Sequence, residues 1–521
     1  MSVDGRDPRL LSPAWDAARA APPARLRLIV LLALPLAAWY FGWLLQPDRI
    51  GNPVLYAMLV GAELFNLAQA SGFWWTVTRA PRVWRRRPLS SGIAVDVMIP
   101  IYDEPVEVVE PTVEAARRLR GAMVRVHVLD DGDREEIRAM ARRNGAAYLR
   151  RSGSFGAKAG NVNAALSRTS APYVLVLDCD HVPDVSFLEW TLDLMADERV
   201  AFVQTPQYYA NSRSGGIAAA SWAQQALFFG AISRGKAAHG AMFCCGTNVL
   251  FRRTALESVG GFPLGSVTED FELSVKMHAR GWQTRYVPRV LACGLGPEDM
   301  SSYVSQQQRW ARGCLGAMRS TLRAKLPSRT RLQYLLSSLY FLSGWTLLIY
   351  MTFPVIRLLT GAQPIAEGTA DQFLIHFAPY FATALTVVAV AGGGAYTFAG
   401  FALAAASFWI HVQASARAAL RRAAKFVVTP KRGAAERQPR AVAPTLVAIG
   451  VLLGVSAFGL AGDRSPATLN NVAFAMLHVT VLVSGAWYAL TVRRGRPRED
   501  ERGEAEPAAE TVEAELVEGP A

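Results

Sequence analysis

Side chains that could bind a metal ion stand together in Asp178-Cys179-Asp180-His181. Two carboxylates spaced i, i+2 at the end of a strand can point together, and hard oxygen ligands at that spacing suit Mg²⁺ or Mn²⁺. Such an ion can bridge two phosphates and neutralise the charge on a leaving diphosphate. A D-x-D triplet alone is weak evidence, but this one follows the apolar residues 173–177 and precedes His181. The segment therefore predicts a metal and diphosphate site.

More acids follow other apolar runs of the same region. Asp103 comes after residues 94–102, and Asp130 and Asp131 end the run 124–130. These runs and 173–178 alternate with helix-like segments, which indicates a mainly parallel sheet covered on both faces. In such sheets a ligand binds beyond the carboxyl ends of the strands. A single acid there would be a turn or cap residue by default, but acids at three successive strand ends favour a site.

A lysine in a glycine-flanked loop could add positive charge to this site. Lys158 lies in the segment GAKAGNVN (156–163), which enters an expected helix. Backbone N–H groups at a helix start, together with a lysine, bind anions. The segment is not a P-loop, because GxxxxGK[ST] is absent. A lysine on a solvent-facing turn is the alternative when the loop is taken alone.

Two later segments have ambiguous patterns. Thr268, Glu269 and Asp270 precede an expected helix over 271–280, where acids are usually helix caps. The segment QQQRW (306–310) lies in an amphipathic stretch before an apolar run, where arginine and tryptophan often contact lipid headgroups. Taken alone, each segment fits that structural role better than a catalytic one.

Long uncharged runs predict an integral membrane protein. They cover residues 28–45, 332–356, 373–416, 441–462 and 465–492, and a bilayer needs about 20 apolar residues for each helix. The 55 Lys and Arg residues against 42 Asp and Glu give a net charge of +13. Because the arginines cluster at the ends of these runs, the charge indicates topology rather than nucleic-acid binding, and it predicts a cytoplasmic N-terminus. In the second span, Glu63, Asn66 and Gln69 share a helix face, which indicates either helix–helix hydrogen bonds or a polar pathway.

These patterns predict seven segments and six membrane crossings. The run 373–416 is expected to cross once, because a second crossing would place the basic residues after it outside. The segments are a cytoplasmic N-terminal segment (1–26), two transmembrane helices (27–78), a catalytic domain (92–325), two transmembrane helices (326–392), an interfacial helix and loop (393–440), two transmembrane helices (441–492) and a disordered acidic tail (493–521). The five cysteines show no zinc-binding spacing and are expected to be reduced thiols.

Taken together, the motifs resemble those of processive family 2 glycosyltransferases, and of the bacterial cellulose synthase catalytic subunits in particular. The matching pieces occur in the order of that family: PIYDEP (100–105), LDDGD (129–133), AKAGNVNAAL (157–166), LDCDHVP (177–183), QTPQYY (204–209), FCCGTNVLFRR (243–253), TEDFELSVKMHARGW (268–282), QQQRW (306–310) and FVVTPK (426–431). The resemblance implies an α/β GT-A-type, Rossmann-like cytoplasmic domain inserted in a helical transmembrane bundle.

The resemblance also implies a role for each matching residue. Asp270 would be the general base, beside Glu269 and Thr268. Asp178, Asp180 and His181 would hold Mg²⁺ or Mn²⁺, and Trp310 and Cys245 would contact the acceptor sugar. The residues implied to bind the nucleotide sugar are Asp103, Asp130, Asp131, Lys158, Asp178, Gln306, Arg309, Thr429 and Lys431. Asp103 stands where the family usually has asparagine, which adds a negative charge near the expected nucleotide.

The implied activity is processive, inverting transfer from a UDP-sugar, with UDP-glucose and a β-1,4-glucan favoured. The growing polysaccharide would cross the cell (inner or plasma) membrane, with an accessory export protein beyond it as a further partner. The alternatives are a mannan, glucomannan, hyaluronan-like or poly-N-acetylglucosamine product, a non-processive lipid-linked sugar transferase, and a catalytically dead channel or scaffold. Only 29 residues follow Val492, so no PilZ domain is expected, and regulation by cyclic di-GMP in cis is not expected.

Overall fold

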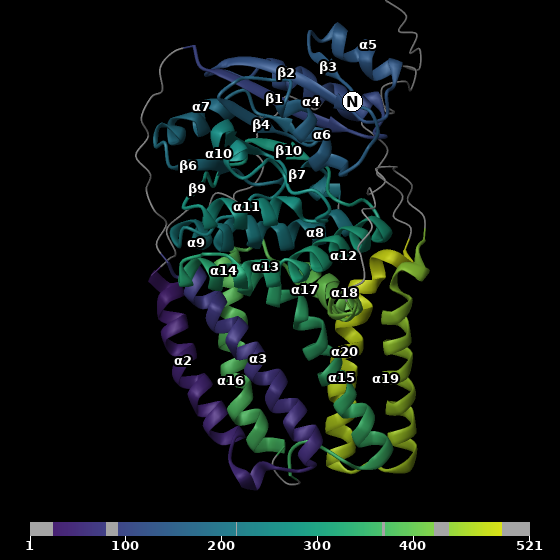
Figure 1. Cartoon of the computed structure of the whole chain (residues 1–521). Coiled ribbons are helices and arrows are strands. Elements are labelled where there is room, and N and C mark those ends of the chain that lie inside the picture. The colour runs from purple at the N-terminus through teal and green to yellow at the C-terminus, as the bar shows by residue number, and fades with distance from the viewer. Residues whose placement is uncertain (1–23, 80–91, 215, 367–369, 421–436, 492–521) are drawn as a thin grey trace, which may run out of the picture.

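An α/β domain stands on a bundle of long apolar helices (Figure 1). The computed structural model describes residues 24–79, 92–214, 216–366, 370–420 and 437–491. Within them, six helices are long and apolar enough to cross a membrane. These are α2 (Ala24–Leu44), α3 (Pro53–Val77), α14 (Ser328–Leu339) continued through η6 (Tyr340–Leu342) into α15 (Ser343–Thr360), α16 (Ala370–Gly392), α19 (Ala443–Gly462) and α20 (Pro466–Leu490). The first of them begins three residues before the predicted boundary at residue 27.

The centre of the α/β domain is a seven-stranded sheet in the order β3-β2-β1-β4-β8-β6-β9. Its strands are β1 (Ala94–Ile101), β2 (Met123–Asp130), β3 (Ala147–Leu149), β4 (Tyr173–Val176), β6 (Val200–Gln204), β8 (Val249–Arg252) and β9 (Gln283–Tyr286). All neighbours pair in parallel except β8, which is antiparallel to β4 and β6. The predicted parallel sheet is therefore mixed at one strand. The parallel register places Ile101 opposite Asp130, so β1 and β2 end at the same edge.

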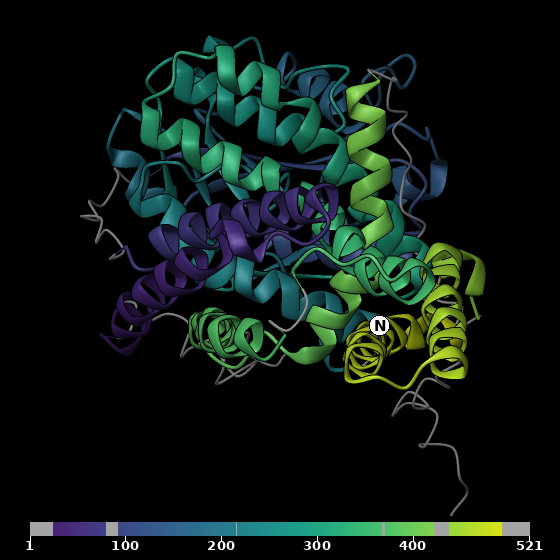
Figure 2. The ribbon, with the colours of Figure 1, turned by 90° about the horizontal axis from the view of Figure 1, so that it is seen from below.

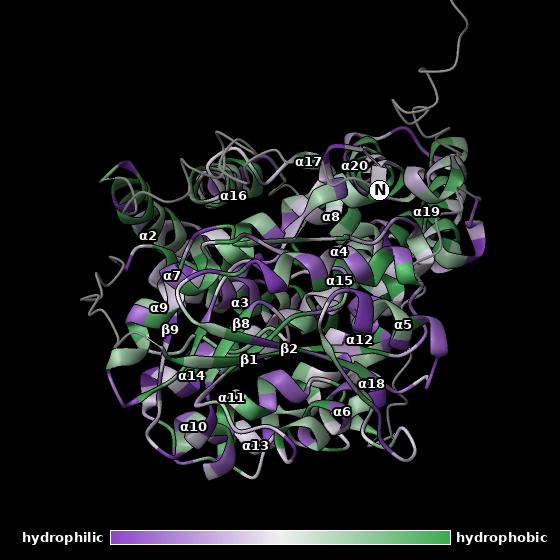
Figure 3. Ribbon diagram, turned by 90° about the horizontal axis from the view of Figure 1, so that it is seen from above, coloured by the Kyte–Doolittle hydropathy of each residue, from purple (hydrophilic) through white to green (hydrophobic). Residues whose placement is uncertain are grey.

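Helices cover both faces of this sheet because its strands are apolar on both sides. In β1, Val95, Val97 and Ile99 pack into one core, whereas Met98 packs into the core of the opposite face. Seen from above, β1 and β8 run in mostly hydrophobic colours through the centre of the domain (Figure 3). The covering helices include α4 (Val106–Arg117), α5 (Glu135–Arg143), α6 (Ala157–Leu166), α7 (Phe187–Thr191), α10 (Arg253–Ser258) and α11 (Glu269–Ala279).

A second sheet and several short helices fill the space between the main sheet and the bundle. The second sheet has the order β5-β10-β7, formed by β5 (Val182–Pro183), β10 (Ala292–Gly294) and β7 (Tyr208–Tyr209). The remaining elements are η2 (Pro47–Arg49), η3 (Leu192–Ala196), η4 (Ala210–Ser214), α8 (Gly216–Leu227), the π-helical turn η5 (Phe228–Ile232), α9 (Ser233–Ala238), α12 (Met300–Gly316), α13 (Met318–Arg323), α17 (Phe398–Ala406), α18 (Phe408–Ala419) and η7 (Pro439–Val442).

The predicted interfacial segment forms a bent pair of helices at the junction between the two parts. α17 and α18 meet at 45°, a geometry that fits either a broken span or a re-entrant segment. Gln224 of α8 donates to the carbonyl of Gly400 in α17 (2.9 Å), and a Cβ on Gly485 of α20 would lie 2.1 Å from the carbonyl oxygen of Ala402. Seen from below, α2 and α3 lie to one side of the bundle and α19 and α20 to the other (Figure 2). α17 therefore contacts both the α/β domain and the bundle.

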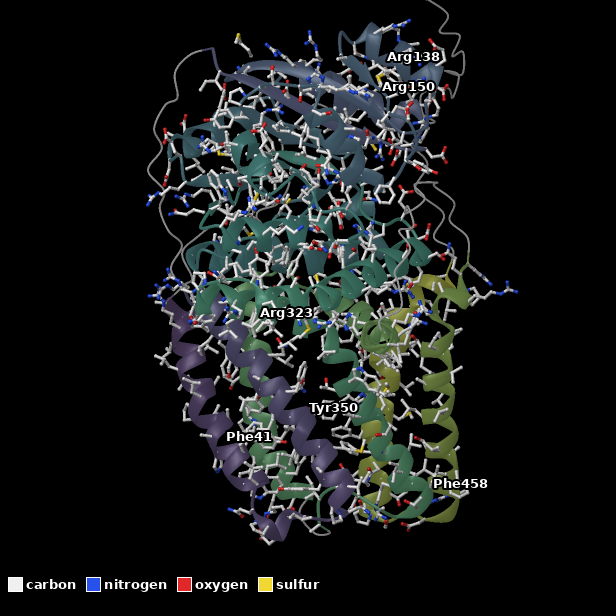
Figure 4. The ribbon with its side chains drawn as sticks, viewed as in Figure 1. Phe41, Arg138, Arg150, Arg323, Tyr350 and Phe458 are labelled. Carbon is white, nitrogen blue, oxygen red and sulfur yellow. The ribbon has the colours of Figure 1, made fainter. Side chains whose placement is uncertain are left out.

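Polar residues within the bundle join α3 to α15. The hydroxyl of Tyr350 donates to Glu63 Oε1 (3.0 Å), and the Asn66 amide donates to the same hydroxyl (2.7 Å). Tyr350 points into the interior of the bundle (Figure 4). Two of the three polar residues predicted on one face of the second span thus form helix–helix hydrogen bonds.

A buried ion cluster lies near the amino end of β1, away from the carboxyl ends of the strands. Asp96 of β1 is fully buried and accepts hydrogen bonds from the Arg253 guanidinium (2.9 Å) and the Ala171 amide (2.9 Å), and His127 Nε2 lies 3.0 Å from its other oxygen. Although burial alone would raise the pKa of Asp96, its hydrogen bonds and the Arg253 charge lower it. The cluster joins β1, β2 and the start of α10.

Replacing Asp96 with asparagine is expected to destabilise the α/β domain by about 3–5 kcal/mol, because it leaves the buried Arg253 guanidinium without its counter-charge. Thermal unfolding of the full-length protein in detergent measures this effect. The matched control is Glu257→Gln, a change of the same kind at an exposed position on α10. Equal transition temperatures for D96N and E257Q would show that the cluster does not stabilise the domain.

Candidate functional site

One cavity of about 770 Å³ brings together most of the residues that the sequence singles out. It opens beyond the carboxyl ends of β1, β2 and β4, as expected for a parallel sheet, and α12 forms its wall toward the bundle. The predicted site residues that line it are Asp131, Lys158, Asp178, Asp180, His181, Cys245, Glu269, Asp270, Gln306, Arg309 and Trp310. Residues up to 179 positions apart in the sequence, from Asp131 to Trp310, thus share one space.

The segment after β4 presents a possible set of metal ligands. One ligand atom from each of Asp178, Asp180 and His181 lies within 4.8 Å of the others. His181 Nδ1 lies 3.2 Å from Asp180 Oδ1, and its buried Nε2 has no hydrogen-bond partner among the described residues. A Cβ on Gly294 would lie within 2.5 Å of the imidazole ring, so β10 fixes the ring in place. Two hard oxygen ligands and one imidazole, whose buried Nε2 is unpaired, fit a divalent ion.

Lys158 connects the metal-ligand segment to the middle of the cavity. Its ammonium contacts the Asp178 carboxylate and donates to the carbonyl of Gly246 (2.7 Å). Burial alone would lower the pKa of Lys158, but the charges of Asp178, Glu269 and Asp270 raise it. The lysine is therefore a cation held among carboxylates, which makes a solvent-facing turn lysine the wrong reading.

The position between Lys158 and Asp270 requires glycine for two reasons. Gly246 has φ +85°, a left-handed conformation that side chains disfavour. A Cβ there would also lie 3.1 Å from Asp270 Oδ2 and 3.8 Å from Lys158 Nζ. Glycine thus lets the backbone pass between a carboxylate and an ammonium that face the same cavity.

Two adjacent carboxyls, Glu269 and Asp270, begin α11 at the cavity wall. The helix starts two residues earlier than the expected Phe271, so both acids lie in its first turn, where the helix dipole favours negative charge. Burial, and then the charge of Asp270, raises the pKa of Glu269 to about 7. Burial also raises the pKa of Asp270, against Arg309 and Lys158, whose charges lower it. A carboxyl with a raised pKa in a cavity is suited to proton transfer.

Thr268 does not line the cavity, unlike Glu269 and Asp270, and its place among the catalytic residues stays a prediction. It is the residue before α11, and its buried hydroxyl has no hydrogen-bond partner within the described structure. Its side chain packs on α12, where a Cβ on Gly313 would lie 2.1 Å from Thr268 Cγ2. The threonine therefore packs α11 against α12, and its side chain does not cap α11.

α12 presents Gln306, Arg309 and Trp310 to the cavity. Their spacing of three and four residues places Gln306 near both others on one helix face. Gln308 of α12 holds the helix against α18, because its amide donates to Gln413 Oε1 of α18 (3.2 Å). The same helix therefore contacts both the cavity and the bent pair α17–α18.

Of the two acids that end β2, only Asp131 faces the cavity. Asp130 is buried, and its oxygens accept from the amides of Gly132 (2.9 Å) and Arg134 (2.9 Å) and from the Tyr148 hydroxyl (3.0 Å). These contacts shape the turn after β2, and the nucleotide contact of Asp130 stays a prediction.

Asp103 also lies outside the cavity lining. It is exposed after β1, whereas its neighbour Glu104 lines the cavity and accepts hydrogen bonds from the Tyr102 and Asp103 amides (2.9 and 3.3 Å). The acid near the expected nucleotide is therefore Glu104 rather than Asp103. The other predicted nucleotide contacts, Thr429 and Lys431, lie outside the described residues.

Two glutamines and an arginine that were not among the predicted site residues hold parts of the cavity. Cys245 lines the cavity, and its backbone is fixed by Gln204, which accepts from the amide (2.9 Å), and Gln207, which donates to the carbonyl (2.7 Å). Arg151 forms a two-point ion pair with Asp131. The motif QTPQYY contained both glutamines, but Arg151 has no distinguishing signal in a chain so rich in arginine.

Comparisons with known proteins identify the relatives of this chain. A family model described as "Glycosyl transferase family group 2" matches residues 173–410. A cellulose synthase catalytic subunit (UDP-forming) from Pseudomonas fluorescens is 30% identical over 513 residues, which cover 92% of this chain and 69% of the relative. Cellulose synthase 1 catalytic subunit (UDP-forming) from Komagataeibacter xylinus is 31% identical over 460 residues, covering 82% of this chain and 61% of that one.

A solved structure shows the same fold. The mannosyltransferase PcManGT from Pyrobaculum calidifontis, in complex with GDP-Man and Mn²⁺, aligns with a TM-score of 0.51 at 19% identity, over 65% of this chain and 97% of the other. The predicted GT-A fold and the predicted enzyme class, glycosyltransferase, are confirmed. The chain belongs to the family 2 glycosyltransferases, in the group that contains the cellulose synthase catalytic subunits.

Proposed function

We propose that this protein polymerises sugar from a UDP-sugar by inverting transfer and passes the polysaccharide across the membrane. UDP-glucose and a β-1,4-glucan are the favoured donor and product, because the relatives are named UDP-forming cellulose synthases. The observation that carries the proposal is the shared cavity, which is lined by the metal-ligand residues, by Lys158, by Asp270 and by α12.

The donor would lie along the edge of the main sheet. Asp131 would bind the uridine part, and Lys158 and Arg309 would stabilise the diphosphate. Asp178, Asp180 and His181 would hold Mg²⁺ or Mn²⁺. A divalent ion there would neutralise charge on the leaving diphosphate, a contribution that is typically several kcal/mol.

The acceptor would enter from the α12 side of the cavity. The indole of Trp310 would pack on the apolar face of the terminal sugar, near Cys245. Asp270 would accept the proton of the acceptor hydroxyl as its oxygen bonds to the anomeric carbon. The bond from that carbon to the diphosphate oxygen breaks in the same step, and UDP leaves with the electron pair. Inversion needs one base and one stabilised leaving group, which matches this arrangement.

The protein would be a multi-pass membrane protein with the cavity on the cytoplasmic side. The six apolar helices and the arginines at their ends support this orientation. Because α12 and α18 contact each other at the junction, a polymer leaving Trp310 would be close to the bundle. Thr429 and Lys431 keep their proposed role in a loop that closes over the nucleotide.

The donor and product are tested with the purified protein in vesicles. UDP-glucose, UDP-N-acetylglucosamine and GDP-mannose are offered separately with Mg²⁺ or Mn²⁺, and any polymer is digested with linkage-specific hydrolases. We expect high-mass product from UDP-glucose alone, degraded by a β-1,4-glucanase and abolished by EDTA. Product from another donor would change the assigned sugar, and turnover that resists EDTA would contradict the proposed metal site.

Changing Asp270 to asparagine is expected to lower the turnover rate by about 10²–10⁴-fold, because it removes the general base. UDP affinity should stay close to that of the unmodified protein, since Asp270 lies at the acceptor end. Turnover and UDP binding are measured on the same preparation, with Asp193→Asn, outside the cavity lining, as the control. Polymer made by D270N at the normal rate would exclude Asp270 as the base.

The transfer rate should decline toward acid pH, because Asp270 must be ionised to act as the base and burial raises its pKa. Burial also raises the pKa of the adjacent Glu269, to about 7. Glu269→Gln removes the adjacent negative charge, so it should lower the pKa of Asp270 and move the acid limb to lower pH. Initial rates from about pH 5 to about pH 9 record the shift. Glu272→Gln, farther along α11, is the control. If the rate of E269Q fell over the same pH range as that of the unmodified protein, Glu269 would not affect the pKa of Asp270.

A further inference from the structure

Arg151 joins two ends of the cavity that lie on different elements. Its Nε and Nη2 donate to the two carboxylate oxygens of Asp131, each at 2.7 Å. The same guanidinium donates to the carbonyls of Phe155 (2.6 Å) and Ala157 (3.0 Å). The side chains of Arg151 and Asp131 are 11% and 4% exposed, so this contact is not a loose surface ion pair.

The carbonyls that Arg151 holds belong to the turn that begins α6. Gly156 and Ala157 both have positive φ, +77° and +47°, and alanine rarely adopts this conformation. The turn is also tightly packed, because a Cβ on Gly160 would lie 2.1 Å from the Phe155 carbonyl oxygen and 2.5 Å from Arg151 Nη1. Contacts with the arginine thus help to maintain a backbone conformation that the sequence alone disfavours.

This turn fixes the position of Lys158 at the start of α6. Lys158 is the second residue of α6, directly after the Ala157 carbonyl that Arg151 holds. From there its ammonium reaches Asp178 and the Gly246 carbonyl. One guanidinium therefore determines the position of Asp131 and, through the turn, the position of Lys158.

We propose that Arg151 is a positioning residue that sets the separation between the nucleoside end and the diphosphate end of the donor site. This inference rests on the proposed function, in which Asp131 and Lys158 bind the two parts of a nucleoside diphosphate sugar. Lysine cannot replace the arginine here. A single ammonium is a point charge, whereas the planar guanidinium bonds both carboxylate oxygens and two carbonyls at once.

The test compares Arg151→Lys with Arg150→Lys in the full-length protein in lipid nanodiscs. Arg150 is the adjacent arginine, exposed and paired with Asp133, and it lies at the end of the domain far from the bundle (Figure 4). For R151K we expect the UDP dissociation constant and the donor KM to rise by about tenfold to hundredfold, the range for hydrogen bonds between charged groups. R150K should match the unmodified protein in both.

A double-mutant cycle separates positioning from general stability. In the Asp131→Asn background, R151K should weaken UDP binding much less than in the unmodified protein, because the carboxylate that it positions is gone. If Arg151 only stabilised the fold, R151K would instead lower UDP affinity by the same factor in both backgrounds. Arg151→Ala adds a second readout: guanidinium ion should restore part of its UDP affinity, and ammonium ion should not.

Each outcome bears on the inference. UDP affinity and donor KM unchanged in R151K, or an equal loss in both backgrounds, would overturn it while leaving the proposed function intact. If the unmodified protein neither bound UDP nor used a UDP-sugar, the proposed function would fall and this inference with it. The two failures are distinguished by the unmodified protein alone.

Discussion

Repulsion between carboxylates is the constraint on which the rest of the site depends. Seven acids of the described residues line one cavity, namely Glu104, Asp131, Asp178, Asp180, Glu269, Asp270 and Glu298. Like charges at short range in a poorly solvated space raise one another's pKa or require counter-charges. The chain meets this constraint differently at each end. Arg151 pairs with Asp131 and Lys158 with Asp178, whereas Asp180 lies beside an imidazole. At Glu269 and Asp270 burial raises both pKa values, although the charges of Lys158 and Arg309 lower them.

The placement of these charges depends on close backbone approaches. Gly246 lets the chain pass between Asp270 and Lys158, and Gly294 leaves room for the His181 ring. At the lower side of the domain, α12 lies between the cavity and the junction helices, and it contacts α18 through Gln308. In the proposed reaction the edge of the sheet would present the donor residues, and α12 would present Trp310 to the acceptor. The reaction would take place where these two parts of the chain meet.

Much of this arrangement could be predicted from the sequence, for reasons that are specific to each element. The apolar runs that form β1, β2 and β4 are strong signals, because a strand buried on both faces must be apolar throughout. The long uncharged helices are equally strong signals, because a helix that crosses a bilayer needs about 20 apolar residues. The D-x-D segment was found by its position after a strand. The contacts of Asp130 and Thr268 were not predictable, because a motif gives residue types but not the direction in which a side chain leaves the backbone. Arg151 was missed because its partner is 20 residues away and the residue before it, Arg150, is also an arginine. The antiparallel direction of β8 also has no local signature, since strand direction is set by the connections.

The contact between Thr268 and Gly313 has a consequence for how this family can vary. Because the threonine methyl occupies the space where a Cβ at position 313 would lie, any larger residue at 313 displaces α11 from α12. Asp270 is two residues from that contact, and Trp310 is three residues from it on the other helix. The two positions should therefore change together among descendants of a common ancestor, a small residue on one helix being retained for as long as the other keeps its branched side chain. In a relative where residues 268 and 313 have both changed size, the distance between Asp270 and Trp310 should differ as well.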